Sequence, residues 1–408
     1  MKPLAQAQVE ILAGVPGLGT EEVPVAEALS RVMAEPAVAT GPVPPFPNSA
    51  MDGYAVRAGD LSSVPVTLPV NEDVAAGSVP TLDVVPGTAT RIMTGAPMPG
   101  GADAVVPVED TESADRSTVI INASVGEGTH VRPAGGDVAP GDVVVEAGVR
   151  LTARHVAALA GAGIAPVVSK VPTVALMSTG DEVVEPDTAE LAPGKIRDTN
   201  RVLLRAMLAD LGVPFVDLGI VGDDTEELRA AYVHAAEVGD VIVSTGGVSM
   251  GDFDFVKEIL RDTGSVDFWR VAMQPGKPFA FGNVSGTPLF GLPGNPVSTF
   301  VSFEQFVRPA ILSMMGATKV FRPRIAGIMG EDVQTNDEKE VFLRVLLAED
   351  SNGSFVAVRS GGQGSNVLST LAAAEAFAVI PVGVGSLSAG DPVTLEMFVW
   401  AENRGIDE

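Results

Sequence analysis

From Val171 onward, short apolar runs alternate with helical patterns, an order that constrains this part of the chain to an α/β fold with a mostly parallel sheet. We predict strands at Val174–Met177, Phe215–Leu218, Val241–Val243 and Pro288–Leu292. We predict helices at Val202–Leu211, Glu226–Glu237 (capped by Asp224 or Thr225), Phe255–Arg261 and Val297–Met315. Gly212 and Pro214 end the first of these helices.

Three of the strands pass directly into a glycine turn. These turns are Ser178–Glu182, Ser244–Phe255 and Gly291–Pro296. Parallel strands end at one edge of the sheet, where doubly wound folds bind ligands. The second turn carries Asp252 and Asp254, where a phosphate loop would carry a lysine, so it favours a hard cation or a cation-bridged phosphate. Any one turn alone is better explained as a routine connection, but the three together predict a site.

Two further features suit an anionic ligand. Asn295 and Pro296 have the residue types preferred at the cap and first position of a helix, whose free N–H groups attract oxyanions. A plain capped helix explains that pattern equally well. Lys277 lies between two prolines in a glycine turn, which holds a compact charge in a stiff backbone. Neither Lys277 nor Lys195 completes a Walker A loop, because no Ser or Thr follows.

The remainder of the chain predicts several smaller domains. Helices are expected at Leu4–Leu12, Val25–Met33 and Leu151–Ala162, and short strands such as Ala104–Val108 and Thr118–Ile121 lie between them. A β module is therefore predicted to be inserted, through the stiff segment Pro42–Pro47, into a helical domain. After Arg324 the strand pattern returns, at Val341–Leu347, Phe355–Val358, Phe377–Pro381 and Val393–Trp400.

Composition excludes several classes of function. The net charge of −26 opposes binding to nucleic acids and anionic membranes, so an anionic ligand needs locally concentrated Lys and Arg or a metal. There is no cysteine to form a disulfide, a thiolate nucleophile or a thiolate zinc site, and the three histidines are far apart. No apolar run reaches the roughly 18 residues of a membrane span, and no signal-peptide core follows Met1. We expect a soluble cytoplasmic protein that does not insert into membranes.

Eight segments, in order, resemble the molybdopterin molybdenumtransferase family, which includes bacterial MoeA and the E domain of gephyrin. They are Asn48–Val56, Arg91–Pro99, Arg132–Asp137, Ser178–Glu182, Gly194–Asn200, Ser244–Asp254, Gln274–Gly282 and Gly291–Ser298. The resemblance implies four domains: a discontinuous N-terminal helical and linker domain (1–45 and 141–170), an inserted β domain (46–140), an α/β molybdopterin-binding domain (171–318) and a C-terminal β-barrel (319–408).

The resemblance also implies an activity. The family transfers molybdenum from molybdate onto adenylylated molybdopterin with a divalent cation, taken here as Mg²⁺, and releases AMP. It implies a homodimer whose cleft combines the α/β domain of one subunit with the inserted domain of the other. It leaves open whether a separate molybdopterin adenylyltransferase acts as partner and supplies the substrate.

The family's functional residues map onto single positions of this chain. The catalytic set is Asp52, Thr94, Glu182, Asp223, Asp254 and Lys277, and the metal set is Glu182, Asp223 and Asp254. The set that binds the pterin substrate is Asp137, Ser178, Gly180, Gly246, Gly247, Ser249, Pro293, Gly294, Asn295 and Pro296. Asp224 adjoins Asp223, so the choice between these two acids stays open. Gln274 stands where the family often has a lysine, which removes one positive charge.

Two other functions compete with this one. A gephyrin-like scaffold would bind a cytoskeletal protein or a membrane-receptor tail, with or without enzymatic activity. Setting the resemblance aside, the acids and Lys277 also suit a magnesium-dependent phosphotransferase acting on a sugar or nucleotide.

Overall fold

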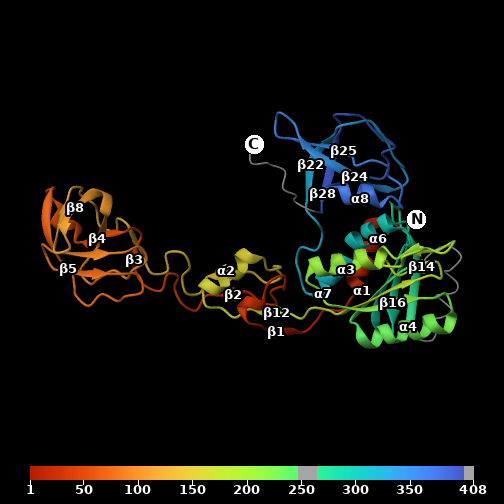
Figure 1. Ribbon diagram of the computed structural model, residues 1–408, viewed down its shortest axis with the longest axis horizontal. Coiled ribbons are helices and arrows are strands. Elements are labelled where there is room, and N and C mark those ends of the chain that lie inside the picture. The colour runs from red at the N-terminus through yellow and green to blue at the C-terminus, as the bar shows by residue number, and fades with distance from the viewer. Residues whose placement is uncertain (247–263, 399–408) are drawn as a thin grey trace.

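The computed structural model of the protein describes residues 1–246 and 264–398, which form an elongated molecule (Figure 1). A β module lies at one end, and a narrow connector joins it to a larger body at the other end. In that body an α/β region and a C-terminal barrel lie next to each other. The chain passes through the connector twice, because the β module is inserted between its two halves.

The α/β region is built on a six-stranded sheet in the order β16-β13-β17-β21-β20-β18. The four parallel strands are β13 (Val174–Thr179), β16 (Phe215–Val221), β17 (Val241–Thr245) and β21 (Thr287–Leu292). The two antiparallel strands are β18 (Gly264–Arg270) and β20 (Pro278–Val284). Every residue of β13 and β17 is buried, which is why these strands are unbroken apolar runs in the sequence. The mostly parallel sheet is confirmed.

Helices cover both faces of this sheet. The helices are α1 (Leu4–Gly14), α3 (Asn200–Leu211), α4 (Thr225–Val238), α6 (Pro296–Ser302) and α7 (Arg308–Met314). On one face, α1, α3, α6 and α7 share a core with Leu176 and Val243, whereas α4 packs on Met177 and Ile242 of the other face. The expected helix Val297–Met315 is interrupted by one π turn, η4 (Phe303–Val307).

The first helix does not belong to the connector, where we expected residues 1–45 to lie. Leu4, Ala7 and Ile11 of α1 are buried in the core of the α/β region, in contact with α7 and η4. Their spacing of three and four residues places them on one face of the helix, and this face packs against the apolar core beside the sheet.

The connector is less helical than expected. Its strands are β1 (Thr20–Glu22), β2 (Ala37–Val38), β11 (Val143–Val145) and β12 (Val167–Ser169), and its helix is α2 (Ala153–Gly161). The predicted helix Val25–Met33 is only a 3₁₀ turn, η1 (Val25–Glu27). Val32 and Met33 form bridges to Arg150 and Val168 instead, so pairing with distant residues draws this segment into an extended conformation.

The β module contains one six-stranded sheet in the order β7-β4-β6-β5-β9-β8, with a small β10-β3 ladder beside it. Its strands are β3 (Asn48–Ser49), β4 (Gly53–Val56), β5 (Val66–Val74), β6 (Ala89–Ile92), β7 (Ala104–Pro107), β8 (Thr111–Asp115), β9 (Thr118–Ile121) and β10 (Val131–Arg132), and its 3₁₀ turns are η2 (Ala58–Leu61) and η3 (Val108–Asp110). Two apolar clusters fill the module and share no residue with the cores of the other regions.

The C-terminal region is a closed five-stranded barrel, as predicted, because β24 pairs with both β25 and β26. Its strands are β22 (Arg324–Met329), β24 (Glu340–Glu349), β25 (Phe355–Arg359), β26 (Ala376–Ile380) and β28 (Pro392–Met397). The short elements α8 (Leu368–Ala373), β23 (Val333–Gln334) and β27 (Ser386–Leu387) complete it. From the α/β region, β19 (Met273–Gln274) pairs with β24 and so joins the two bodies. No helix within the described ranges is long and apolar enough to cross a membrane.

Candidate functional site

The predicted glycine turns meet at the carboxyl edge of the parallel strands. The Gly180 N–H donates to the Val221 carbonyl at 3.1 Å, which joins the turn after β13 to the end of β16. The Gly246 N–H donates to the Leu292 carbonyl at 3.2 Å, which joins the turn after β17 to the end of β21. At Gly246 (φ +97°) a Cβ would lie 2.3 Å from the Thr179 carbonyl oxygen, so only glycine fits there.

A buried polar network fixes the geometry of this edge. Asn200, at the start of α3, donates from Nδ2 to Thr245 Oγ1 and to the Gly294 carbonyl, both at 2.8 Å. Thr299 Oγ1 donates to the Pro293 carbonyl at 2.6 Å. These contacts tie the end of β17, the turn after β21 and the first turn of α6 into one unit.

Two polar atoms at this edge are buried without a hydrogen-bond partner among the described residues. They are the Oγ atom of Ser178, at the end of β13, and the Oδ1 atom of Asn200. Buried polar atoms are normally satisfied, so these two are available to a ligand or an ordered water. Ser178 was expected at the site. Asn200 was not, although it ends the polar run Asp198-Thr199-Asn200 that precedes the helix.

The acids after β13 and β16 are held side by side. The Asp181 N–H donates to the Asp223 carboxylate at 3.3 Å, and the Asp223 N–H donates to the Asp181 carboxylate at 3.1 Å. Glu182 also lies at this turn, since its carboxylate oxygen comes within 2.5 Å of where a Cβ on Gly180 would be. Asp224 instead caps α4 by accepting from the N–H groups of Glu226 and Glu227. Of the two neighbouring acids, Asp223 is the one at the sheet edge.

Lys277 lies near the opposite side of the edge. Lys277 directly precedes β20, and in the antiparallel ladder between β20 and β21 Ala280 is opposite Gly291, so the start of β20 lies at the end of β21. The side chain of Lys277 is exposed, and the turn before it packs against α6, because a Cβ on Gly276 would lie 3.0 Å from Ser302 Oγ.

The start of α6 is less open than its sequence suggests. Asn295 does not cap the helix with its side chain; its Nδ2 donates to Ser365 Oγ of the C-terminal region at 3.0 Å. The Val297 N–H donates to the Ser365 carbonyl at 3.1 Å, so one of the expected free donors is already engaged. The barrel therefore contributes a loop to this side of the site, which the sequence did not reveal.

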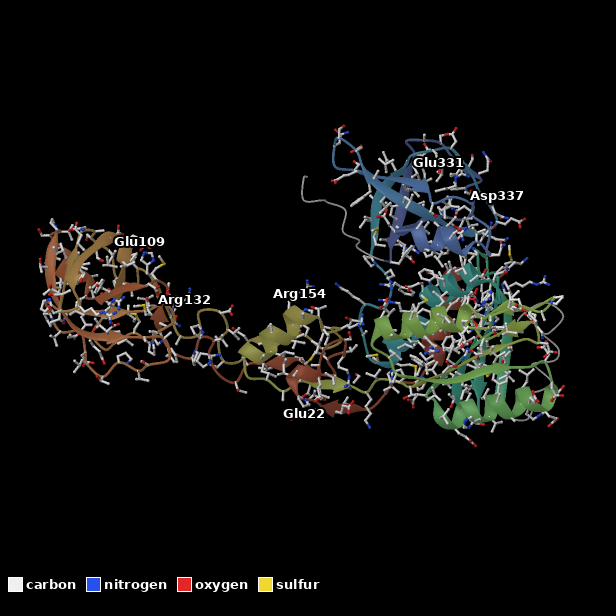
Figure 2. The ribbon with its side chains drawn as sticks, viewed as in Figure 1. Glu22, Glu109, Arg132, Arg154, Glu331 and Asp337 are labelled. Atoms are coloured by element: carbon white, nitrogen blue, oxygen red, sulfur yellow. The ribbon has the colours of Figure 1, made fainter. Side chains whose placement is uncertain are left out.

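Asp52 and Thr94 come together in the β module. The Asp52 carboxylate accepts from the Thr94 N–H at 2.7 Å and from the Thr94 hydroxyl at 2.8 Å. These two hydrogen bonds, aided by the charge of Arg91, lower the pKa of Asp52. Asp137 is exposed in the loop after β10, and Figure 2 shows Arg132 of β10 at the end of the module that faces the connector. Within one chain the whole module lies far from the α/β sheet edge.

Three expected site residues, Gly247, Ser249 and Asp254, lie outside the described residues, as does the helix expected at Phe255–Arg261. The described residues contain no group of three or more acidic, His or Cys side chains that forms a metal site. Mg²⁺ commonly binds through one or two carboxylates together with water and substrate phosphates. The adjacent Asp181 and Asp223, with Glu182 at the same turn, fit that donor set.

Sequence comparisons cover nearly the whole chain. Residues 2–163 match the MoeA N-terminal region (domain I and II), residues 175–313 a probable molybdopterin binding domain, and residues 326–398 the MoeA C-terminal region (domain IV). A molybdopterin molybdenumtransferase of Haemophilus influenzae is 37% identical over 401 residues, covering 98% of this chain and 99% of the relative. Molybdopterin molybdenumtransferase 2 of Mycobacterium tuberculosis is 39% identical over 390 residues, covering 93% and 94%.

Solved structures agree with these matches. A molybdopterin biosynthesis MoeA protein from Pyrococcus horikoshii superposes with a TM-score of 0.81 at 29% identity, covering 98% of this chain and all of the other. A second crystal structure of a MoeA protein from that organism gives a TM-score of 0.77 at 34% identity.

Proposed function

The chain belongs to the molybdopterin molybdenumtransferase (MoeA) family, and from this premise we propose that it inserts molybdenum from molybdate into adenylylated molybdopterin and releases AMP. The protein is a transferase of molybdenum cofactor biosynthesis. The observation that carries the specific reaction is the sheet edge, where glycine turns, paired acids and a lysine converge. The scaffold alternative has no support in these matches.

Different residues of the site would bind the cation and the anions. Asp223 and Glu182, together with Asp254, are the residues that would hold Mg²⁺. When bound, that ion neutralises phosphate charge and polarises the phosphoryl bond. Lys277 supplies a fixed positive charge for the oxyanions of the substrates. The buried network of Asn200, Thr245 and Thr299 keeps the turns in register for the ligand.

Asp52 and Thr94 act, in this proposal, from the second subunit of a homodimer. Supporting this, the pair is preorganised by two hydrogen bonds but lies in a module far from the sheet edge of its own chain (Figure 1). The two hydrogen bonds from Thr94 hold the Asp52 carboxylate in place to orient the substrate or the attacking oxygen.

The decisive experiment measures AMP release from adenylylated molybdopterin by the purified protein, with and without molybdate. We expect release to depend on molybdate and on Mg²⁺, and to be lost in Asp254→Ala while size-exclusion chromatography shows an unchanged oligomer. Normal turnover by that variant would contradict the assignment. Phosphate transfer to a sugar or nucleotide without molybdate-dependent AMP release would favour the phosphotransferase alternative.

A further inference from the structure

A second concentration of charge lies away from the sheet edge. A cavity of about 390 Å³, here called the arginine pocket, is lined by Arg150, Arg308, Arg322, Glu304, Phe300 and Phe398, among others. Arg150 comes from the connector, Arg308 begins α7, and Arg322 lies in the segment that leads from α7 into the barrel. The pocket therefore lies where the connector, the α/β region and the barrel meet.

The protein satisfies only part of the hydrogen-bonding capacity of these arginines. Arg322 donates from Nε and Nη2 to the Glu304 carboxylate at 2.7 and 2.9 Å. Arg308 donates from Nη1 to the Val320 carbonyl at 2.9 Å, and Arg150 donates to the carbonyls of Leu211 (2.9 Å) and Ser30 (3.4 Å). A guanidinium has five N–H donors, so all three arginines keep donors for another acceptor.

The charges of the pocket are also unbalanced. Three guanidinium groups line the pocket together with two carboxylates, Glu304, whose side chain is 3% exposed, and Asp210, which is exposed. Glu396, which also acts on Arg308 and Arg322, is itself paired with Arg324. Burial and the neighbouring charge of Arg322 lower the pKa of Arg308 to about 10 and lower that of Arg150 as well. All three remain charged at neutral pH, which leaves one positive charge in excess of the lining carboxylates Glu304 and Asp210. In a chain of net charge −26 this local excess favours anion binding.

We propose that the arginine pocket binds a compact tetrahedral oxyanion, such as sulfate or inorganic phosphate. The excess positive charge attracts an anion, and planar guanidinium forks match the oxygens of a tetrahedral oxyanion. Because the three arginines come from different segments, the bound ion ties the connector and the barrel segment to α7. Binding to the folded state alone raises its stability by linkage, so the ion acts as a structural clamp.

The test is a calorimetric titration of the full-length protein with sodium sulfate and with inorganic phosphate at constant ionic strength, without molybdopterin or molybdate. Arg150→Gln removes one fork, and we expect its affinity for both ions to fall about tenfold or more, the scale of one charge-assisted hydrogen bond. Arg154→Gln is the matched control: Arg154 is exposed on α2 in the same connector (Figure 2), and its loss should leave the affinity unchanged.

Two further variants keep the proposal falsifiable. Arg150→Lys preserves the charge but not the fork, and an intermediate loss of affinity supports recognition by the guanidinium. Lys277→Gln alters the proposed catalytic edge, and it should leave sulfate binding intact. Sulfate affinity that is lost in Lys277→Gln but kept in Arg150→Gln overturns the proposal, as does equal affinity in all variants. Binding of AMP with no binding of either inorganic ion overturns it too. None of these results depends on molybdenum transfer.

Discussion

Asp223 and Asp224 are adjacent in the chain, yet their hydrogen-bond partners give them different roles. Asp223 exchanges hydrogen bonds with Asp181 across two loops, and its carboxylate lies at the sheet edge. Asp224 accepts two N–H bonds from the first turn of α4, both at 3.0 Å, as a helix cap does. The sequence placed an acid at this edge but could not choose between them, because both follow the same strand.

This difference gives a prediction at the residue scale. Asp223→Asn should reduce molybdate-dependent AMP release at least tenfold while leaving the free energy of unfolding nearly unchanged, because the amide keeps the shape of the side chain but loses the charge. Asp224→Ala should instead cost about 1 kcal/mol of stability, the usual loss of a cap, with a small effect on turnover. Steady-state kinetics and urea unfolding of both variants measure these effects. The opposite pattern would show that Asp224 is the functional acid.

At the scale of elements, Gly212 determines how α3 ends and how the connector meets it. Gly212 has φ +73° in the left-handed region, and a Cβ there would lie 3.0 Å from the Cβ of Ser30 in the connector. Gly163, just after α2, has a similar φ of +68° but no atom within 4 Å of its would-be Cβ. Comparing substitutions at the two positions therefore distinguishes the cost of backbone strain from the cost of a steric contact.

We therefore predict that Gly163→Ala and Gly212→Ala both destabilise the protein, Gly163→Ala by about 1–2 kcal/mol from backbone strain alone. Gly212→Ala should cost more, because Ser30 must also move. Thermal and urea unfolding compare the two variants directly. Equal losses of stability in the two variants would mean that Ser30 moves away from the new Cβ at no measurable cost in free energy.

The elements also show what the sequence can and cannot predict. The strands β13 and β17 were predictable because complete burial makes them unbroken apolar runs that end in glycine turns. The helix expected at Val25–Met33 does not form, because Val32 and Met33 pair with residues more than a hundred positions away. The role of Asn295 was missed for the same reason: its partner, Ser365, comes from the barrel. Local patterns report burial and capping, but they do not report which distant segment competes for a backbone group.

At the scale of the whole molecule, the elongated shape separates two halves of the expected site. The Asp52–Thr94 pair is formed in the β module, whereas Asp181, Asp223 and Lys277 lie at the edge of the α/β sheet (Figure 1). If both sets act on one substrate, they must come from two subunits. Each site would then combine the module of one chain with the sheet edge of the other.

A mixed dimer tests this arrangement without any structure of the assembly. Asp52→Asn and Asp223→Asn chains, carrying different tags, are co-expressed, and the heterodimer is isolated by two affinity steps. When the site is shared, one of its two sites receives both substitutions and the other receives neither, so the heterodimer should recover about half of the wild-type AMP release. When each site is built from a single chain, both sites carry one substitution and activity should stay at the level of the homodimeric variants. The two geometries thus predict activities of the heterodimer that differ by about the full effect of losing a catalytic carboxylate. Exchange of subunits between dimers is controlled by repeating the measurement on freshly separated fractions.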